Sequence, residues 1–510
     1  MNNVILLGTA SGVGKSTLAS AICRYLKKKD LKVAPFKALN ISLNSYVTIN
    51  GDEMGRAQVV QARACGIEPM AIMNPLLLKP CGNNKTQIIL NGKVYSNMDS
   101  YKYKEMCEFF RKEVKKSYED ISKKFDFIVL EGSGSCAEIN LKDTDIANTY
   151  MAKSVKAPII LVSDIDRGGV FASVLGTIML LDEDERKLLR GVVINKFRGD
   201  KDKFKPAIKQ LEDLIGVKVL GVMPYFRLDI EDEDGVSDKI KNKNSKENNL
   251  DVAIIRLKHM SNFTDFNSFN RVSGISVRYV ETLEELKNPD VIVIPGTKNT
   301  LFDLNELKNN GLFEKIKDLV NKEKVILFGI CGGYQMLGQS IKDPLGIEGN
   351  IREEEGFKFL GISTEFSELK TLKHTNGYIV SRHDLMSNSF GKKVIGYEIH
   401  NGRSEILDDK NVFIQDENKN ILGLSNEKGN VYGTYIHGIF DSTEFLNSLV
   451  ETFKEKFNKD LLITEENKKL SYDEYREKQY DELLKLMEEN LDMEELDRIL
   501  GLKWLKKEEK

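Results

Sequence analysis

The 510-residue sequence predicts an α/β protein with two doubly wound parallel-sheet domains and a helical C-terminal extension. Along residues 1–230, short β-branched runs alternate with helical patterns, and a second series of this kind begins at residue 250. Between the two series, residues 231–249 are polar, rich in Lys and Asn, and poor in side chains that could pack. We therefore expect two α/β domains joined by a linker.

The first domain, residues 1–230, contains apolar runs of strand length separated by stretches long enough for a helix. Alternation of this kind favours parallel strands, because each parallel crossover needs a helix or a comparably long connection. The six runs are NVILLG, KVAPFK, DFIVLEG, APIILVSD, LRGVVINK and KVLGVMP.

The second domain, predicted over residues 250–445, repeats the pattern with the runs DVAIIRL, DVIVIPG, KVILFGICGG and NVYGTYIHG. Residues 446–510 are charged and helical in pattern, and we expect a solvated extension packed by Leu and Met. Ser471 and Glu474 are spaced as a capping box at the start of one of its helices.

The composition is that of a globular protein, with 41% hydrophobic and 30% charged residues. Because 75 basic residues nearly balance 78 acidic ones, charge gives no reason to expect a nucleic acid partner. The longest nearly apolar segment, residues 168–181, is shorter than the ~20 residues of a membrane-spanning helix. Six scattered cysteines without a CxxC pair fit a reducing cytoplasm. We expect a soluble cytoplasmic protein without a membrane partner, and the sequence leaves a homo-oligomer open.

A glycine-rich loop follows the first predicted strand: residues 8–17 read GTASGVGKST and lead into a helical pattern. The strict pattern GxxxxGK[ST] needs glycine at position 9, where this chain has Thr9, so the loop is a variant P-loop. Its backbone N–H groups would face phosphates, Lys15 would meet the β and γ oxygens, and the Ser16 hydroxyl would ligate Mg²⁺. The loop residues expected to bind ATP are Gly12, Gly14, Lys15, Ser16 and Thr17.

Acidic and amide side chains could complete this phosphate site. Glu131 ends the strand DFIVLEG, where a carboxylate can emerge beside the loop as a metal ligand. Asp52 and Glu53 form a second candidate metal-binding pair, with a solvated turn as the alternative. Asn195 ends the later predicted strand in VVINKFRG, and its amide would either read the adenine edge or cap a helix.

Cys331 lies in the stretch VILFGICGGYQMLG, between an apolar strand and a helical pattern. Gly329, Gly332 and Gly333 permit a tight turn there, and the helix dipole would favour a thiolate. This setting is typical of a nucleophile on a strand-to-helix turn, whereas the alternative is a small buried apolar residue. His437, at the end of a strand of the same predicted sheet, is the candidate base, with a core histidine as its alternative.

An acyl-enzyme also needs hydrogen-bond donors for its oxyanion. The N–H of Gly332, directly after the nucleophile, and one near Gly296 in IPGTKNT are the natural pair. Nucleophile, base and donors together predict hydrolysis of an amide.

Several of these segments resemble known families. GICGGYQ is similar to the GxCxGxQ elbow of class I glutamine amidotransferases, and GTASGVGKST is similar to the loop of dethiobiotin synthetase-type ATPases. Together, in this order, they resemble the cobyric acid synthase family of the cobalamin pathway. The resemblance extends over residues 1–445 through NSYVTINGDEMGRAQVVQA, NPLLLKP, VLEGSGSCAEINL, SDIDRGGVFAS, VINKFRGD, PGTKNT, GYEIHNGR and GTYIHGIFD.

The resemblance implies an amidoligase that uses ATP, Mg²⁺ and L-glutamine to amidate the b, d, e and g carboxylates of a corrinoid, adenosylcobyrinic acid a,c-diamide. Cys331 would carry the glutamyl thioester and His437 would act as base. Many class I enzymes have Pro-Glu after this histidine, whereas here Gly438 and Ile439 follow, so no residue is assigned to orient His437. Leu39 stands where a glutamine is expected in the family, which leaves the contact of that loop open.

Three polar residues near predicted strand ends are candidates for contacts with the corrinoid or the metal: Asn140, Asp145 and Arg167. Without the resemblance, each of them would be interpreted as a loop or cap residue.

Two other functions fit parts of the pattern. Another glutamine-dependent ligase, such as cobyrinic acid a,c-diamide synthase or a CTP synthase-like enzyme, would share both sites, although GYEIHNGR and NSYVTINGDEMGRAQ favour the cobyric acid synthase family. A partition-type ATPase switch with an inert amidotransferase-like domain would lack glutaminase activity. Such switches usually carry a second Lys near the start of the loop, where this chain has Ala10.

Overall fold

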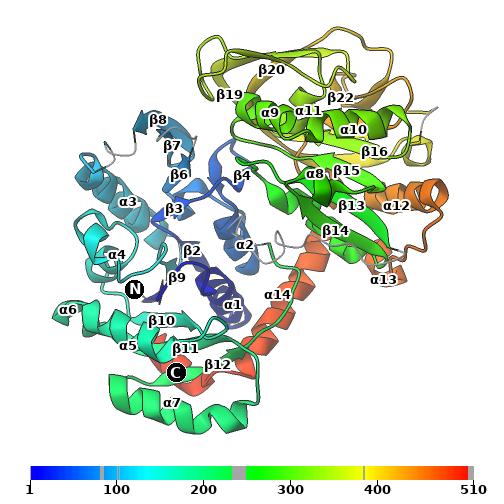
Figure 1. Cartoon of the computed structure of the whole chain (residues 1–510). Coiled ribbons are helices and arrows are strands. Elements are labelled where there is room, and N and C mark those ends of the chain that lie inside the picture. Colours follow the sequence, from blue (N-terminus) through cyan, green and yellow to red (C-terminus); the bar gives the residue numbers. More distant parts are fainter. Residues whose placement is uncertain are drawn as a thin grey trace.

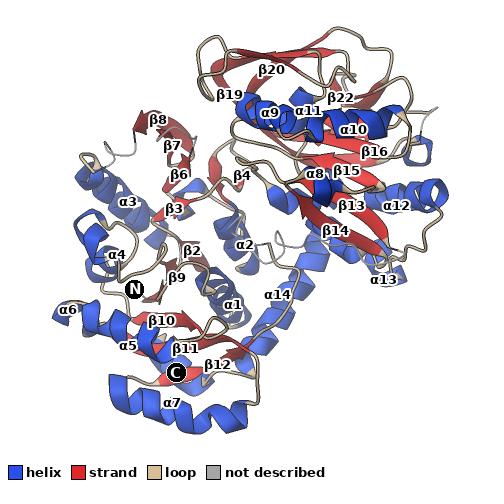
Figure 2. Ribbon diagram, viewed as in Figure 1, coloured by secondary structure: helices blue, strands red, loops and turns tan. Residues whose placement is uncertain are grey.

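The computed structural model describes residues 2–80, 85–99, 102, 104–231, 249–382 and 385–502. Two α/β domains lie against each other, and the C-terminal helix α14 (Tyr472–Glu488) runs from one to the other (Figure 1). Helices cover both faces of the parallel sheets (Figure 2). The predicted fold class is therefore confirmed. We call the two units the N-terminal domain and the second domain.

The central sheet of the N-terminal domain has six parallel strands in the order β12-β11-β10-β1-β9-β2. All six predicted runs form these strands, and their β-branched side chains are buried because helices pack on both faces. The strands are β1 Asn2–Gly8, β2 Val33–Phe36, β9 Phe127–Glu131, β10 Ile159–Asp164, β11 Leu189–Phe197 and β12 Val219–Pro224. The helices are α1 Lys15–Lys28, α2 Arg56–Ala64, α3 Cys107–Ser122, α4 Thr149–Ser154, α5 Val170–Leu180, α6 Glu183–Arg186 and α7 Lys201–Ile215, with 3₁₀ turns η1 Ala71–Met73 and η2 Ile139–Thr144.

Two small sheets of this domain have no counterpart among the predicted strands. A four-stranded sheet lies beside β2, and a two-stranded antiparallel hairpin, β4–β5, reaches toward the second domain (Figure 1). The strands of the two sheets are β3 Leu39–Ile41, β4 Ser45–Val47, β5 Glu53–Gly55, β6 Leu76–Pro80, β7 Lys85–Leu90 and β8 Lys93–Asp99. The first three of them have three residues each, which gives too little periodicity to be recognised in a sequence.

The second domain is built on an eleven-stranded sheet, of which β14, β13, β15, β16 and β23 form the continuous parallel part. The four predicted runs correspond to β13, β15, β16 and β23. Beyond β23 the sheet becomes largely antiparallel, which the predicted doubly wound pattern did not include. The strands are β13 Leu250–Ile255, β14 Ile275–Val280, β15 Val291–Ile294, β16 Ile326–Ile330, β17 Ser340–Lys342, β18 Glu353–Glu355, β19 Ile362–Ile379, β20 Lys393–Ile406, β21 Val412–Gln415, β22 Ile421–Ser425 and β23 Val431–Thr434.

The helical elements of the second domain flank this sheet and connect its strands. They are η3 Phe263–Arg271, α8 Leu283–Leu286, α9 Thr300–Asn309, α10 Leu312–Asn321, α11 Gly332–Met336, η4 Ser387–Ser389, η5 Ile439–Asp441, α12 Thr443–Phe457 and α13 Glu465–Lys469. The boundary predicted at residue 445 falls inside α12, whose Leu449 and Phe453 are fully buried in the core of this domain.

The C-terminal helices pack through Leu and Met as predicted, but they belong to the cores of the two domains and do not form a separate solvated extension over residues 446–510. Leu483 and Met487 of α14 are buried in the same apolar core as α1, so this helix is part of the N-terminal domain's packing. The predicted capping box of Ser471 and Glu474 is confirmed at its start. The last described helix is α15, Met493–Ile499. Within the described ranges, none of the helices combines the length and the apolar character needed to cross a bilayer.

Residues 232–248 of the predicted linker lie outside the described residues. The first residue of that linker, Glu231, is a buried anchor: its carboxylate pairs with Arg56 at 2.7 Å and with Arg476 of α14 at 2.9 Å. Burial alone would raise the pKa of Glu231, but the two guanidinium groups outweigh it and lower that pKa. The chain is therefore held against α14 where it leaves the N-terminal domain.

Candidate active sites

Cys331 occupies a sharp turn between β16 and α11, as the sequence predicts. Its backbone angles are φ 53° and ψ −108°, a conformation that an L-residue adopts only when the surrounding structure imposes it. The turn is enforced by close packing, because a Cβ at Gly333 would lie 1.9 Å from the carbonyl oxygen of Ile294. The side chain is only 6% exposed, and its Sγ donates to the carbonyl oxygen of Ile399 at 3.6 Å. Strain of this kind at a cysteine is typical of a presented nucleophile.

His437 lies beside Cys331 and is held by a carboxylate that the sequence did not reveal. Its Nδ1 is 2.7 Å from Oδ2 of Asp265, whose Oδ1 also accepts the N–H of Gly438 at 3.2 Å. Both side chains are buried. Asp265 therefore binds Nδ1 of the imidazole and leaves Nε2, the other ring nitrogen, to face Cys331.

The electrostatics of this group favour a protonated imidazole. Burial lowers the pKa of His437, but the charges of Asp265 and Cys331 outweigh burial and raise it to about 10. Nε2 of His437 is a buried nitrogen without a hydrogen-bond partner among the described residues, so it is available to exchange a proton with the thiol or a leaving group.

Asp265 was missed because it lies in η3, 172 positions before His437, in the run FTDFNSFNR. No motif marks it, and its spacing from the cysteine and the histidine carries no pattern. The usual Pro-Glu position after the histidine holds Gly438 and Ile439, and Asp265 reaches the same nitrogen from another segment.

The structure brings both predicted oxyanion residues to the nucleophile. A Cβ built on Gly296 would lie 3.0 Å from Cε1 of His437 and 3.6 Å from Cβ of Cys331. A Cβ on Gly332 would lie 3.1 Å from the backbone nitrogen of Thr297. The segments around Gly296 and Gly332 thus meet at Cys331, and their role as oxyanion donors remains a prediction.

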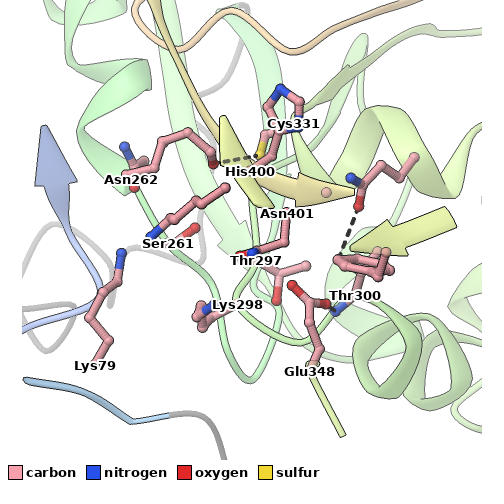
Figure 3. Close-up of a pocket in the computed structure, with 15 residues that line it drawn as sticks. Lys79, Ser261, Asn262, Thr297, Lys298, Thr300, Cys331, Glu348, His400 and Asn401 are labelled. Carbon is pink, nitrogen blue, oxygen red and sulfur yellow. Dashed lines mark hydrogen bonds between the residues drawn. The ribbon is translucent and has the colours of Figure 1, made fainter. Parts of the chain in front are cut away.

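A pocket opens on Cys331, and residues of both domains line it (Figure 3). Lys79 enters from β6 of the N-terminal domain, whereas the other labelled residues belong to the second domain. Glu348 is buried beneath the pocket and accepts the N–H of Thr300 at 2.7 Å. Burial raises the pKa of Glu348 to about 7, although Lys298 opposes that rise.

The residues predicted to bind phosphate lie together at the carboxyl ends of β1 and β9. Lys15 is buried, and its Nζ donates to the carbonyl oxygens of Ala10 at 3.2 Å and Gly134 at 2.7 Å. Gly14, at φ 98°, precedes α1 in a conformation that favours glycine. Asn195 reaches the loop from β11, where its Nδ2 donates to the carbonyl oxygen of Val13 at 2.8 Å. The loop, the lysine and Asn195 therefore lie together, with Gly12 on the loop and Thr17 in the first turn of α1.

Glu131 is the buried centre of this site. Its Oε1 accepts the Ser16 hydroxyl at 2.7 Å and Nζ of Lys37 at 3.0 Å, and its Oε2 accepts Nε2 of Gln61 at 2.5 Å. Hydroxyl and carboxylate oxygens are the ligands that Mg²⁺ prefers, so Ser16 and Glu131 fit the predicted metal site. Among the described residues there is no cluster of three His, Cys, Asp or Glu, and phosphate oxygens would have to complete the coordination.

The structure contradicts the second predicted metal pair. Glu53 is fully buried, and its carboxylate pairs with Lys79 at 2.6 Å and with Lys370 of the second domain at 2.5 Å. Burial opposes ionisation of Glu53, but the two ammonium groups outweigh it and lower the pKa of that carboxyl. Asp52 pairs with Lys93 at 2.8 Å. Two cations already neutralise Glu53, so it serves the contact between domains instead of a metal.

Within the described part of the chain, no hydrogen bond or ion pair joins the three candidate substrate residues to one another. Asp145 accepts the N–H groups of Ala147, Asn148 and Tyr150 at 2.9–3.1 Å, which is the role of a cap for α4. Asn140 and Arg167 are exposed, on η2 and on the loop before α5. Asp145 thus follows the alternative interpretation as a cap, whereas Asn140 and Arg167 stay predictions.

Comparison with known proteins agrees with this pair of sites. The family described as "CobQ/CobB/MinD/ParA nucleotide binding domain" matches residues 4–234, and the family described as "CobB/CobQ-like glutamine amidotransferase domain" matches residues 251–445. The first contains the phosphate site, and the second contains Cys331, His437 and Asp265.

Curated relatives match along nearly the whole chain. The chain is 55% identical to a protein of Clostridium botulinum named cobyric acid synthase, over 98% of this chain and 99% of the relative. Relatives of the same name from Clostridium perfringens and Caldanaerobacter subterraneus are 53% and 45% identical, over 98% of this chain and at least 98% of each relative. A solved structure of PurLQS from Thermotoga maritima, at TM-score 0.31 and 18% identity over 39% of this chain and 97% of that one, is too distant to bear on function. The chain belongs to the cobyric acid synthase family.

Proposed function

We propose that this chain makes cobyric acid by ATP- and glutamine-dependent amidation of the b, d, e and g carboxylates of adenosylcobyrinic acid a,c-diamide. The family supports the reaction, and the observation that carries the glutamine half is the buried group of Cys331, His437 and Asp265 in the second domain. A strained cysteine beside a carboxylate-held histidine is suited to cleave an amide.

The pocket on Cys331 has ionisable groups that suit the two ends of an amino acid. Lys298 offers a cation for an α-carboxylate, and the buried Glu348 offers a carboxylate for an α-ammonium. A bound ammonium would favour the ionised form of Glu348, whose pKa is raised to about 7 by burial. We infer that L-glutamine binds here with its carboxamide at Cys331.

At this site the thiol of Cys331 gives its proton to Nε2 of His437, and the thiolate attacks the carboxamide carbon of glutamine. N–H groups near Gly296 and Gly332 stabilise the oxyanion, and His437 returns the proton to the departing nitrogen as the C–N bond breaks. Ammonia and a glutamyl thioester result. Water, deprotonated by His437, then cleaves the thioester to glutamate and the free thiol.

At the phosphate site, a corrinoid carboxylate would attack the γ-phosphoryl group of ATP, which releases ADP and forms an acyl phosphate. Lys15 stabilises the charge on the phosphate oxygens, and Ser16 and Glu131 would hold Mg²⁺, which neutralises further charge there. Ammonia attacks the acyl phosphate carbon, phosphate leaves, and the amide forms. Because water would compete for the acyl phosphate and acid would trap ammonia as ammonium, we propose a sheltered route between the domains.

Replacing the nucleophile separates the two half-reactions. Cys331→Ser should abolish glutamine-supported amidation, a loss of roughly 10³-fold or more, while ammonium still supports amidation. The matched control is Cys107→Ser, because that buried thiol also donates to a backbone carbonyl at 3.6 Å but lies in the other domain. Loss of both activities in Cys331→Ser would contradict separate sites.

The acceptor is tested by product mass. Incubation with ATP, glutamine and adenosylcobyrinic acid a,c-diamide should yield the product with four new amides. No mass change with this acceptor, but amidation of a corrinoid that lacks the a and c amides, would favour the a,c-diamide synthase alternative. Free exchange of labelled external ammonia into product during glutamine-driven turnover would contradict the sheltered route.

A further inference from the structure

Two segments without an assigned chemical role, residues 44–56 and residues 396–403, meet at the interface between the domains. The first forms the β4–β5 hairpin of the N-terminal domain, and the second lies on β20 of the second domain. Tyr397 on β20 is 3% exposed, and its contacts with the hairpin join the two segments. The same tyrosine also contacts the catalytic base.

Tyr397 holds His437 through both its ring and its backbone. The two rings stack with centroids 5.4 Å apart and planes at 21°. Tyr397 N–H donates to the carbonyl oxygen of His437 at 3.2 Å, and His437 N–H donates back at 2.9 Å. Asp265 fixes one edge of the imidazole by a hydrogen bond, whereas Tyr397 fixes its face.

The hydroxyl of Tyr397 extends this contact into the N-terminal domain. It donates to the carbonyl oxygen of Ser45 at 3.2 Å and accepts Nδ2 of Asn262 at 2.7 Å. Nδ2 of Asn262 also donates to the same Ser45 oxygen at 2.9 Å. Asn262 in turn lines the pocket on Cys331, where Figure 3 shows it beside Ser261. One backbone carbonyl of the hairpin is thus bound by two groups of the glutamine site.

Tyr46 of the hairpin packs on the same tyrosine from the other side. Its ring lies 5.1 Å from that of Tyr397, at 65°, and 5.7 Å from that of His374. His374 Nε2 lies 2.8 Å from the carbonyl oxygen of Val47, the last residue of β4. The hairpin is therefore docked by aromatic contacts and by hydrogen bonds.

The hairpin also leads directly to the phosphate site. β5 ends at Gly55, and α2 begins at the next residue. Gln61 on α2 donates to Glu131, which accepts the hydroxyl of Ser16 on the P-loop. A ligand that displaces the hydrogen bond between Gln61 and Glu131 would release a contact of α2, the helix that directly follows the hairpin. An unbroken series of contacts thus connects the P-loop to His437.

We propose that Tyr397 is a positioning residue that keeps the imidazole of His437 in its productive place while the β4–β5 hairpin is docked, and that α2 makes this docking respond to nucleotide. The inference rests on the proposed glutaminase function of Cys331. It assigns Tyr397 to the glutamine half-reaction and the hairpin to its control from the other domain. Ammonia is then released at full rate only when the phosphate site is ready to use it.

Tyr397→Phe tests the connection, because it keeps the ring stack and the backbone pair but removes the hydroxyl that binds Ser45. Glutamine hydrolysis is measured with and without an ATP analogue that carries a non-hydrolysable β–γ bridge. We expect the analogue to stimulate the wild type. In Tyr397→Phe, kcat should fall about tenfold and the stimulation should be lost, with KM for glutamine within about twofold. Tyr397 does not line the pocket, which is why KM should be spared.

Tyr46→Leu removes the ring contact from the N-terminal side and leaves the second domain's own residues unchanged, so it should also lower kcat and the stimulation. Tyr378→Phe is the matched control, since its hydroxyl contacts the exposed Glu417 at 3.2 Å. If Tyr397→Phe and Tyr46→Leu match Tyr378→Phe in kcat and in stimulation, the proposal is overturned. If the wild type itself does not hydrolyse glutamine, the proposed function fails instead.

Discussion

At the proposed glutamine site the cysteine is fixed by backbone strain and the histidine by a carboxylate, whereas at the proposed phosphate site buried side chains hold one another by hydrogen bonds. Cys331 lies at φ 53° in a turn without room for a Cβ at Gly333, and Asp265 fixes His437. Lys15 and Ser16, by contrast, bond to backbone carbonyls and to Glu131.

The difference follows from what each site must do. A cysteine nucleophile needs its base and its oxyanion donors in place before glutamine arrives, because these groups stabilise charge that appears during the reaction. A phosphate site can exchange internal hydrogen bonds for bonds to phosphate and metal when the nucleotide binds. We therefore expect the first site to be organised before its substrate binds, and the second to exchange internal hydrogen bonds for bonds to its ligand.

Among the variants that test this contrast, the largest effect is expected at the phosphate site. Lys15→Met should reduce amidation roughly 10³-fold with either nitrogen source, because the charge on the transferred phosphoryl group loses its fixed cation. Glutamine hydrolysis measured without nucleotide should continue. The control is Lys203→Met on the exposed face of α7. An equal loss of nucleotide-free hydrolysis in Lys15→Met would show that the two sites are not separable.

A smaller effect is expected from Asp265→Asn. Glutaminase kcat should fall roughly 10²-fold, less than the ~10⁴ of a serine triad because a thiol needs less activation. Asp265 keeps the pKa of His437 raised, to about 10, against the opposing effect of burial. The protonated imidazole persists below that pKa and is lost above it. Without the carboxylate, the pKa of His437 falls and the alkaline limb of kcat moves to lower pH.

The pH profile of glutamine hydrolysis measures this shift directly. Asp318→Asn on α10 serves as the matched control. The carboxylate of Asp318 forms an ion pair with Lys322 on the same helix and lies away from Cys331 and His437 in the chain. An unchanged alkaline limb in Asp265→Asn would remove Asp265 from the catalytic group.

The smallest effects are expected on stability, when one glycine of each site is replaced by alanine. Gly333→Ala should destabilise the second domain by roughly 1–3 kcal/mol, because its Cβ would lie 1.9 Å from the Ile294 carbonyl. Gly12→Ala should cost about 1 kcal/mol, since its φ of 68° disfavours a side chain but no atom lies within 4 Å of the added Cβ. Thermal unfolding midpoints measure both variants. A larger shift for Gly12→Ala would reverse the contrast between the rigid and the adaptable site.

Much of the architecture could be predicted because its causes are local. The β-branched runs that became β1, β2 and β9 to β13 need only to be apolar and short to form buried parallel strands. The largely antiparallel half of the second sheet and the β4–β5 hairpin were missed, since their strands are short or mixed in polarity and depend on partners distant in the chain.

The sequence by itself determined the residues from which the two sites are predicted. Lys15 and Ser16 directly follow a glycine-rich loop, and Cys331 lies among its glycines, because both predicted sites begin at a strand-to-helix turn whose residues are consecutive. Only the tertiary structure decided what supports them. Asp265 reaches His437 across 172 positions, Lys79 crosses from the other domain, and Glu53 became an anchor between domains instead of a metal ligand. Contacts between distant segments depend on how the elements pack, and packing imposes no fixed number of residues between the two partners, so no sequence pattern reveals them.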